Sequence, residues 1–353
     1  MTLVSAMQPP GPPIKVRINN GDIARAVADV MAQAFDGGHW HPAAIEYRVA
    51  GPRTLRLHLG ACAARMDYGR SLQPAPAAIN SVDIAVIAAD DANLRCLVPI
   101  PSTEGHAHIT DAYAAIWHAD ASPLLYLFDR RQGRGVVWLA AGNAPPWELG
   151  RPVCPLVHVA LLDTPWTTAH SAAIGRGGQF LMLAGAGSSG KSTAALACAH
   201  AGWDYAGDDY VLADVENGEV APLYASARLR PATEHMFAEW VMRGERSMSA
   251  TPDPRHELAL DQLLRPGQLR GGPVRALLLV RRRGADRPTF EPATRGEAFH
   301  ALFLNTHYGA PGPLAVTARK LAALVGHTPV FHVDTGKEPR AIPEALERFM
   351  ANL

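Results

Sequence analysis

Lysine is scarce in this sequence, and the chain carries no net charge. Lysine and arginine together number 33, as do aspartate and glutamate, and only four of the basic residues are lysines: Lys15, Lys191, Lys320 and Lys337. Proteins that bind nucleic acid or anionic membranes through surface charge carry an excess of positive residues. The composition therefore predicts neither nucleic acid nor a membrane as a partner.

Cysteine is equally rare, and no two cysteines lie close together in the sequence. The four are Cys62, Cys96, Cys154 and Cys198. Without a Cys-x-x-Cys pair they predict neither a zinc site nor a disulfide framework, and each is expected to be a small buried hydrophobic residue. The histidine pairs His39/His41 and His106/His108 have no cysteine or acidic cluster beside them. We expect structural or solvent-exposed histidines there rather than metal ligands.

Long apolar runs are absent too. No stretch approaches the roughly 18 apolar residues of a membrane-spanning helix, and the first ten residues lack a basic start followed by an apolar segment. We therefore expect a cytoplasmic protein. The chain has 353 residues, 48% of them hydrophobic and 19% charged, which is typical of a globular protein and suggests two domains.

The first part of the chain is expected to form an α+β recognition domain over residues 15–147, after a flexible Pro-rich N-terminus at 1–14. A helix is expected over 20–35, and residues 109–118 are a candidate second helix. Runs typical of strands occupy 45–49, 54–59, 82–88, 97–100, 124–128 and 135–139. Residues 144–153 contain two consecutive prolines and a glycine, and we expect a linker there.

Residues 148–353 are expected to form a P-loop α/β domain. Its apolar runs lie at 155–162, 171–175, 179–184, 203–206, 210–213, 275–280 and 329–334. Helices are expected directly after residue 191 and over 258–264, 313–325 and 343–352. Apolar runs that alternate with helices in this way indicate a nucleotide-binding α/β core.

Residues 185–193 carry the phosphate-binding pattern G-x-x-x-x-G-K-[ST], and one of the few lysines occupies its lysine position. The segment reads Gly185-Ala186-Gly187-Ser188-Ser189-Gly190-Lys191-Ser192-Thr193. An apolar run precedes it and an Ala-rich run follows, in the order strand, loop and helix that the motif requires. In such a loop the backbone N–H groups and the helix N-terminus bind nucleotide phosphates. We predict that the segment binds ATP, with Lys191 on the β- and γ-phosphates and Ser192 on Mg²⁺.

Two adjacent carboxylates, Asp208 and Asp209, follow a short aromatic and apolar run. In a fold of this kind the strand end faces the bound phosphates. One carboxylate suits Mg²⁺, which prefers oxygen ligands, and a second can accept the proton of an attacking hydroxyl. The pair thus favours phosphoryl transfer, with an Asp-rich turn that caps the next element as the alternative.

From residue 170 to residue 214 the sequence resembles the HPr kinase/phosphorylase family of P-loop serine kinases. The resemblance rests on His170 at the start of a strand, a turn at 175–178, the P-loop and the Asp208-Asp209 pair. It implies an HPr-kinase-like fold and transfer of the γ-phosphoryl of ATP to a serine hydroxyl. It also implies that Asp208 is the catalytic base, that Asp209 joins Ser192 as a Mg²⁺ ligand, and that His170 adjusts the base.

Two departures from the bacterial HPr kinases point away from HPr itself as the substrate. Thr193 replaces the glutamate that follows their Lys-Ser pair, and residues 223–231 replace their Arg-Gly-Leu-Gly segment. The pattern is more similar to divergent HPr-kinase-related proteins, some of which phosphorylate the terminal serine of a lasso-peptide precursor. The implied acceptor is therefore a serine of a peptide or protein.

Several alternatives stay open at the level of the sequence. Arg228 and Arg230 are candidates to clamp phosphate oxygens, but in so arginine-rich a chain an exposed strand face explains them as well. Instead of a peptide kinase, the chain is also compatible with a nucleotide-dependent scaffold that lacks kinase activity, or with a kinase for free serine or a sugar. Whether it forms a homo-oligomer is open too.

Overall fold

The structure is a computed structural model, and it describes two compact units of the chain. The described residues are 43–49, 53–59, 63–68, 83–89, 106–109, 111–118, 124–131 and 134–140, and 154–353 apart from 225, 244–245, 249–255, 261–262 and 310–312. Apart from short stretches, the first unit ends at Asp163 and the second begins at Thr164, whereas the predicted boundary lay between 147 and 148. Outside the described residues lie the predicted flexible segment 1–14, helix 20–35, strand 97–100 and linker 144–153, together with Cys62, Cys96, His39 and His41.

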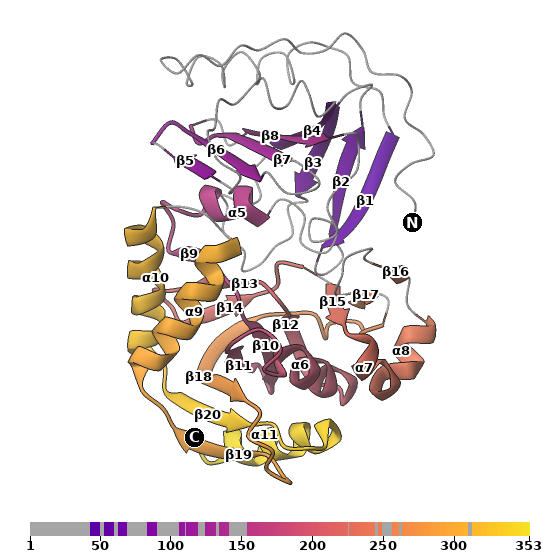
Figure 1. Cartoon of the computed structure of the whole chain (residues 1–353), viewed down its shortest axis with the longest axis vertical. Coiled ribbons are helices and arrows are strands. Elements are labelled where there is room, and N and C mark those ends of the chain that lie inside the picture. Colours follow the sequence, from indigo (N-terminus) through magenta and orange to yellow (C-terminus); the bar gives the residue numbers. More distant parts are fainter. Residues whose placement is uncertain are drawn as a thin grey trace. The chain divides into compact units, whose positions relative to one another are not determined.

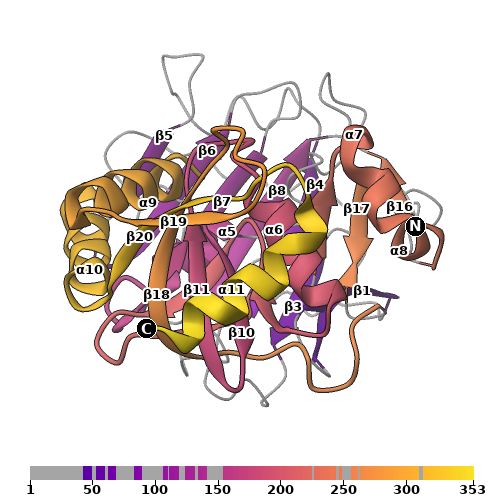
Figure 2. The same cartoon turned by 90° about the horizontal axis from the view of Figure 1, so that it is seen from below.

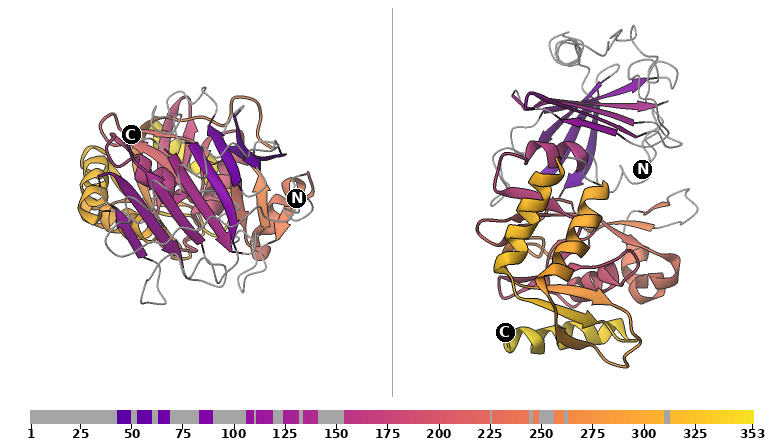
Figure 3. Two further views of the ribbon diagram at one scale, coloured as in Figure 1. Left: turned by 90° about the horizontal axis from the view of Figure 1, so that it is seen from above. Right: turned by 60° about the vertical axis from the view of Figure 1, so that its left-hand side comes forward.

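The first unit contains an eight-stranded sheet in the order β1-β2-β3-β4-β8-β7-β6-β5 (Figure 3, left). Its strands are β1 (Ala43–Val49), β2 (Arg53–Leu59), β3 (Ala63–Tyr68), β4 (Asp83–Ala89), β5 (His106–Ile109), β6 (Tyr113–His118), β7 (Leu124–Asp129) and β8 (Arg134–Ala140). From β2 onward each pair is antiparallel, except the parallel pair β4 and β8. The strands predicted at 45–49, 54–59, 82–88, 124–128 and 135–139 are confirmed.

The candidate helix over 109–118 is wrong, because this segment forms the end of β5 and all of β6. Ala114 and Ile116 are buried, at the spacing of two residues that a strand with one buried face requires. They pair with Phe128 and Tyr126 of β7, which are also buried. Packing against a neighbouring strand thus outweighs the helix preference of the alanines.

The apolar run at 155–162, predicted to belong to the nucleotide-binding core, instead forms a helix of the first unit. This helix is α5 (Cys154–Ala160), and Leu156, Val157 and Val159 are buried in it. A short apolar run is compatible with a buried strand or a buried helix, so periodicity alone does not separate the two.

The second unit is a mixed α/β domain with a nine-stranded sheet and six α-helices. The sheet strands are β9 (Trp166–Ala169), β10 (Ala172–Arg176), β11 (Gln179–Ala184), β12 (Asp204–Gly207), β13 (Val211–Asp214), β14 (Glu219–Ala221), β18 (Gly272–Arg281), β19 (Thr289–Pro292) and β20 (Val330–Asp334). The helices are α6 (Lys191–His200), α7 (Pro231–Glu234), α8 (Ala238–Arg243), α9 (Arg295–Gly309), α10 (Leu314–His327) and α11 (Ile342–Ala351). Two 3₁₀ turns, η1 (His235–Phe237) and η3 (Pro339–Ala341), precede α8 and α11.

The central strand β11 is buried on both faces. Leu181 and Leu183 belong to the core that α6 and α11 complete, whereas Phe180 and Met182 belong to the core that α9 and α10 complete. This alternation is what a strand between two layers of helices requires. The helices α9 and α10 thus cover one face of the sheet, and α6 and α11 cover the other (Figures 1 and 2).

Most predicted elements of this unit are confirmed. The strands expected at 171–175, 179–184, 203–206, 210–213, 275–280 and 329–334 are β10, β11, β12, β13, β18 and β20. The helices expected after 191 and over 313–325 and 343–352 are α6, α10 and α11. The helix expected over 258–264 is wrong, because β17 (His256–Ala259) lies there between β15 (Ser226–Leu229) and β16 (Arg246–Met248) in a separate three-stranded sheet.

Among the described residues, no helix has both the length and the apolar character needed to cross a membrane.

The approach of β14 to the residue before β18 provides a test of this packing. A Cβ added at Gly271 would lie 1.9 Å from the carbonyl oxygen of Val220, so Gly271→Ala forces the backbone apart. We expect a loss of about 1–3 kcal/mol in the free energy of unfolding, measured by urea denaturation.

The matched control is Gly326→Ala, because a Cβ on this glycine of α10 meets no atom within 4 Å. Alanine there should leave the stability unchanged or raise it by up to about 1 kcal/mol. Equal stability of the two variants would contradict the close approach at Gly271.

Candidate nucleotide-binding site

The predicted P-loop connects β11 to α6, as the sequence motif requires. A β-hairpin leads into it: β10 and β11 are antiparallel, and Gly177 and Gly178 in the turn both have positive φ, 62° and 80°. This conformation is typical of a two-residue hairpin turn, and glycine adopts it without strain. The turn at 175–178, which is part of the resemblance to HPr kinases, thus lies in a hairpin directly before the P-loop.

Two glycines of the loop are needed for geometric reasons. Gly185 has φ 144°, and a Cβ there would lie 2.8 Å from the carbonyl oxygen of Val280 in the neighbouring β18. Gly190 has φ 107° and precedes the first residue of α6. Between them Ala186, Gly187 and Ser188 are exposed, and Ser188 has the positive φ of 64°. Successive residues of this kind turn backbone N–H groups toward one side, which is how such loops bind anions.

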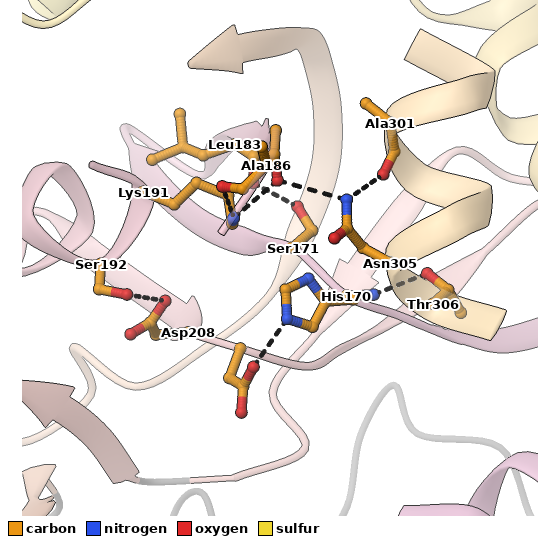
Figure 4. Close-up of polar contacts among 12 residues, drawn as sticks. His170, Ser171, Leu183, Ala186, Lys191, Ser192, Asp208, Ala301, Asn305 and Thr306 are labelled. Carbon is orange, nitrogen blue, oxygen red and sulfur yellow. Dashed lines mark hydrogen bonds and ion pairs between the residues drawn. The ribbon is translucent and has the colours of Figure 1, made fainter. Parts of the chain in front are cut away.

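Lys191 is folded back over this loop. Its Nζ donates hydrogen bonds to the carbonyl oxygens of Gly185 at 2.8 Å and Ala186 at 3.0 Å (Figure 4). The residue is only 7% exposed. Burial lowers its pKa, although the nearby Asp208 and Asp209 act in the opposite direction. The ammonium group is therefore held within the loop that is predicted to surround the phosphates.

Ser192 and Asp208 meet at the start of α6. The strand β12 pairs with β10 and ends at Gly207, which places Asp208 beside the helix N-terminus. Ser192 Oγ donates a hydrogen bond of 3.1 Å to Asp208 Oδ1 (Figure 4). Asp208 is 4% exposed, and its burial and the neighbouring Asp209 raise its pKa to about 6, despite the bond from Ser192 and the charge of Lys191.

His170 and Asp209 form a second pair in the same region. His170 Nε2 lies 2.9 Å from Asp209 Oδ1, and the Asp209 side chain is 27% exposed. Asp209 also has a positive φ of 73°, which is uncommon for a residue other than glycine and is often found at functional sites. His170 lies between β9 and β10, and its ring meets the Tyr210 ring edge to face at 5.1 Å.

Helix α9 supplies residues that the sequence analysis missed. The His170 backbone N–H donates to Thr306 Oγ1 at 2.9 Å. Asn305 Nδ2 donates to the Ala301 carbonyl at 2.6 Å and to the Gly185 carbonyl at 3.4 Å. Asn305 therefore shares with Lys191 one acceptor of the loop. A signal for this helix exists in the sequence, because Thr294 and Glu297 have the spacing of a capping box.

The structure thus brings together His170, the P-loop from Gly185 to Ser192, Asp208 and Asp209. The remaining predicted residues lie as follows. Thr193 is the third residue of α6 and is partly exposed. Arg228 lies on the partly exposed face of β15, and Arg230 directly follows that strand. Two of the four cysteines, Cys154 and Cys198, lie in the described residues, and both are buried as expected.

The chain matches no known protein-family model, and no curated protein is similar to it. Within the described residues, no group of three or more His, Cys, Asp or Glu side chains is placed so that it could hold a metal ion.

The raised pKa of Asp208 makes stability depend on pH. An aspartate ordinarily titrates near 3.8, and Asp208 titrates in the folded protein at about 6. Between these values the folded state binds the proton more tightly than the unfolded state, so stability contributed by protonated Asp208 is lost as pH rises from about 4 to 6. Asp208→Asn removes this dependence. Without magnesium, the stability of the variant relative to wild type should rise by about 2 kcal/mol between pH 4 and pH 6.

Urea unfolding of both proteins at several pH values between 3.5 and 8 measures this difference. Asp286→Asn, at an exposed position, controls for the change in net charge. A stability difference between Asp208→Asn and wild type that stays constant over this pH interval would contradict the buried environment of Asp208.

Proposed function

We propose that this protein is an ATP- and Mg²⁺-dependent kinase related to HPr kinase/phosphorylase, which transfers the γ-phosphoryl group to a serine hydroxyl of a peptide or protein. The observation that carries the proposal is the contact between the P-loop Ser192 and Asp208, with Asp209 beside it. A P-loop alone indicates phosphate binding. A P-loop with two adjacent carboxylates has in addition the groups that metal binding and proton removal need.

Ser192 and Asp208 are the residues that would hold Mg²⁺. Neighbouring ligands of an octahedral Mg²⁺ with bonds of about 2.1 Å lie about 3 Å apart. The Ser192 and Asp208 oxygens are separated by 3.1 Å, so this pair fits one ion. When bound, the ion would neutralise charge on the β- and γ-phosphates. This assignment differs from the one that the family resemblance implies, in which Asp209 is the ligand.

Asp209 is then the better candidate for the catalytic base. A base must reach the hydroxyl of the substrate, and the Asp209 side chain is 27% exposed whereas Asp208 is buried. His170 contacts Asp209 through Nε2 and is itself fixed by Thr306, so the carboxylate has a defined orientation. Asp209 would take the proton as the serine oxygen bonds to the γ-phosphorus, and the bond to the β-phosphate oxygen breaks to release ADP.

Lys191 would supply the cation of the loop. In the structure its Nζ is bonded to the Gly185 and Ala186 carbonyls, and it would exchange these for the β- and γ-phosphates of ATP. Asn305 would continue to donate to the Gly185 carbonyl after this exchange, so the buried acceptor keeps a partner. Catalysis would then rest mainly on positioning and charge neutralisation.

The division of roles between the two aspartates is testable. Asp208→Asn should weaken ATP binding in a Mg²⁺-dependent way, because a metal ligand becomes a weaker neutral one. Asp209→Asn should bind Mg-ATP like wild type but transfer phosphate about 10²–10⁴-fold more slowly, because the base is lost. Calorimetric titration of ATP at several Mg²⁺ concentrations and an ADP-release assay distinguish the two variants.

His170→Gln is the matched variant for the base, since it removes the ring beside Asp209 and leaves the Ser192–Asp208 pair in place. It should slow transfer without changing the metal dependence. If instead Asp209→Asn changes the Mg²⁺ dependence of ATP binding and Asp208→Asn does not, Asp209 is the metal ligand and Asp208 the base, as the family resemblance implies.

The acceptor is the second test of the proposal. Free serine offers few contacts, so the binding energy of a peptide is needed to hold the hydroxyl in line with the γ-phosphoryl group. Peptides that contain serine, including peptides that end in serine like a lasso-peptide precursor, should gain one phosphate from ATP. Mass spectrometry should detect the product, and replacement of the acceptor serine by alanine should abolish it.

Lys191→Ala is the control protein and should give no product, because it lacks the cation on the β- and γ-phosphates. Equal rates with free serine and with serine peptides would favour a small-molecule kinase. Binding of ATP without transfer to any acceptor would favour a nucleotide-dependent scaffold.

A further inference from the structure

Arg282 lies beside the P-loop, although it belongs to no motif. The strand β18 runs parallel to β11 and extends beyond it, because Ala184 at the end of β11 pairs with Leu279 while β18 continues to Arg281. Arg282 is the next residue. Parallel neighbouring strands end at the same edge of a sheet, so the end of β18 flanks the loop that follows β11.

The guanidinium group of Arg282 is close to the last glycine of the loop. A Cβ added at Gly190 would lie 3.9 Å from Arg282 Nε and 3.6 Å from Thr335 Oγ1. Gly190 immediately precedes Lys191, the first residue of α6. The loop and helix N–H groups at this point are those that cradle the α- and β-phosphates in P-loops.

Arg282 also differs from the two arginines beside it. Arg281 Nη2 and Arg283 Nη1 lie 3.6 Å and 3.8 Å from the same carboxylate oxygen of Glu291. Arg282 is exposed and has no hydrogen-bond or ion-pair partner among the described residues. Since neighbouring residues of an extended segment point to opposite sides, the three arginines separate into one pair bound to Glu291 and one cation at the loop.

The backbone around Arg282 is fixed by a buried carboxylate. Asp334 at the end of β20 accepts hydrogen bonds from the N–H groups of Arg283 at 2.9 Å, Gly336 at 3.0 Å and Ala285 at 3.4 Å. Asp334 is 7% exposed. The segment that carries Arg282 is therefore tied to the sheet on its C-terminal side, which limits the positions that the guanidinium can reach.

We propose that Arg282 is a second phosphate-binding cation of the nucleotide site and contacts the α- or β-phosphate of the bound nucleotide. This inference rests on the proposed function, because it requires a nucleotide in the P-loop. A guanidinium donates in a planar fork that matches two phosphate oxygens, whereas the ammonium of Lys191 acts as a point charge. The two cations would thus reach the phosphates from different elements, Arg282 from the end of β18 and Lys191 from α6.

The test compares ATP and ADP, both with Mg²⁺, by calorimetric titration of the full-length protein. Arg282→Ala should weaken both nucleotides by roughly 10- to 100-fold, because the α- and β-phosphates are common to them. Arg282→Lys should give intermediate affinities, since it keeps the charge but loses the fork. Arg283→Ala is the matched control and should bind both nucleotides within about twofold of wild type, because its side chain lies near Glu291.

Each outcome decides the question. Arg282 is exposed, so unchanged melting temperatures are expected and would show that lost affinity is not lost folding. Wild-type affinity in Arg282→Ala would overturn this inference and leave the proposed function standing. A loss confined to ATP would place the guanidinium at the γ-phosphate and overturn the assignment to the α- or β-phosphate. A wild-type protein that binds neither nucleotide would overturn the proposed function together with this inference.

Discussion

The candidate site depends on the packing of α6 against the sheet. Every residue from Ala194 to Ala199 is buried, and apart from Leu196 these are alanines and one cysteine. Small side chains let a helix approach a sheet closely, because less volume separates the two backbones. The helix contributes to one core with Leu181 and Leu183 of β11 and Ile174 of β10. Its N-terminus is thereby held at the end of β11, where the phosphate-binding loop begins.

That packing also determines which side chains can meet. The strand β12 pairs with β10, so its end lies next to the first turn of α6, and Ser192 reaches Asp208. On the opposite face of the sheet, α9 contributes Ala298 and Leu302 to the other core and brings Asn305 and Thr306 to the same edge. The site thus lies at one edge of the sheet. Helix α6 contributes Ser192 to it from one face, and α9 contributes Asn305 and Thr306 from the other.

The parts of this arrangement that sequence predicts are those set by local interactions. The strand, loop and helix of the P-loop follow from a contiguous pattern of glycine, lysine and serine, and β11 has the predicted bounds of 179–184. The hairpin before it was implied by the family resemblance, and in the structure Gly177 and Gly178 form its turn with positive φ. Asp208 lies at the predicted strand end because β12 is a short apolar run whose limits are visible in the sequence.

Other parts depend on partners that are distant in the sequence. Residues 258–264 were expected to be helical, but His256–Ala259 forms a strand because β15 and β16 pair with it on both sides. Helix α9 was missed, although Thr294 and Glu297 form a reciprocal capping box, with Glu297 N–H bonded to Thr294 Oγ1 and Thr294 N–H to Glu297 Oε2. The run Arg281-Arg282-Arg283 does not by itself point to the loop, because the position of Arg282 follows from the extension of β18 beyond β11.

The Gly185 carbonyl shows how local and distant contributions combine in one atom. Lys191, six residues away, and Asn305, 120 residues away, both donate to it. The lysine contact can be anticipated from the motif, since the two residues open and close one loop. The asparagine contact exists only once α9 has packed on the sheet. Because a buried carbonyl left without a donor is costly, the second donor makes it less unfavourable for Lys191 to leave for a phosphate. The motif therefore provides Lys191, whereas the packing of α9 provides Asn305, the donor that stays on the Gly185 carbonyl when Lys191 moves to a phosphate.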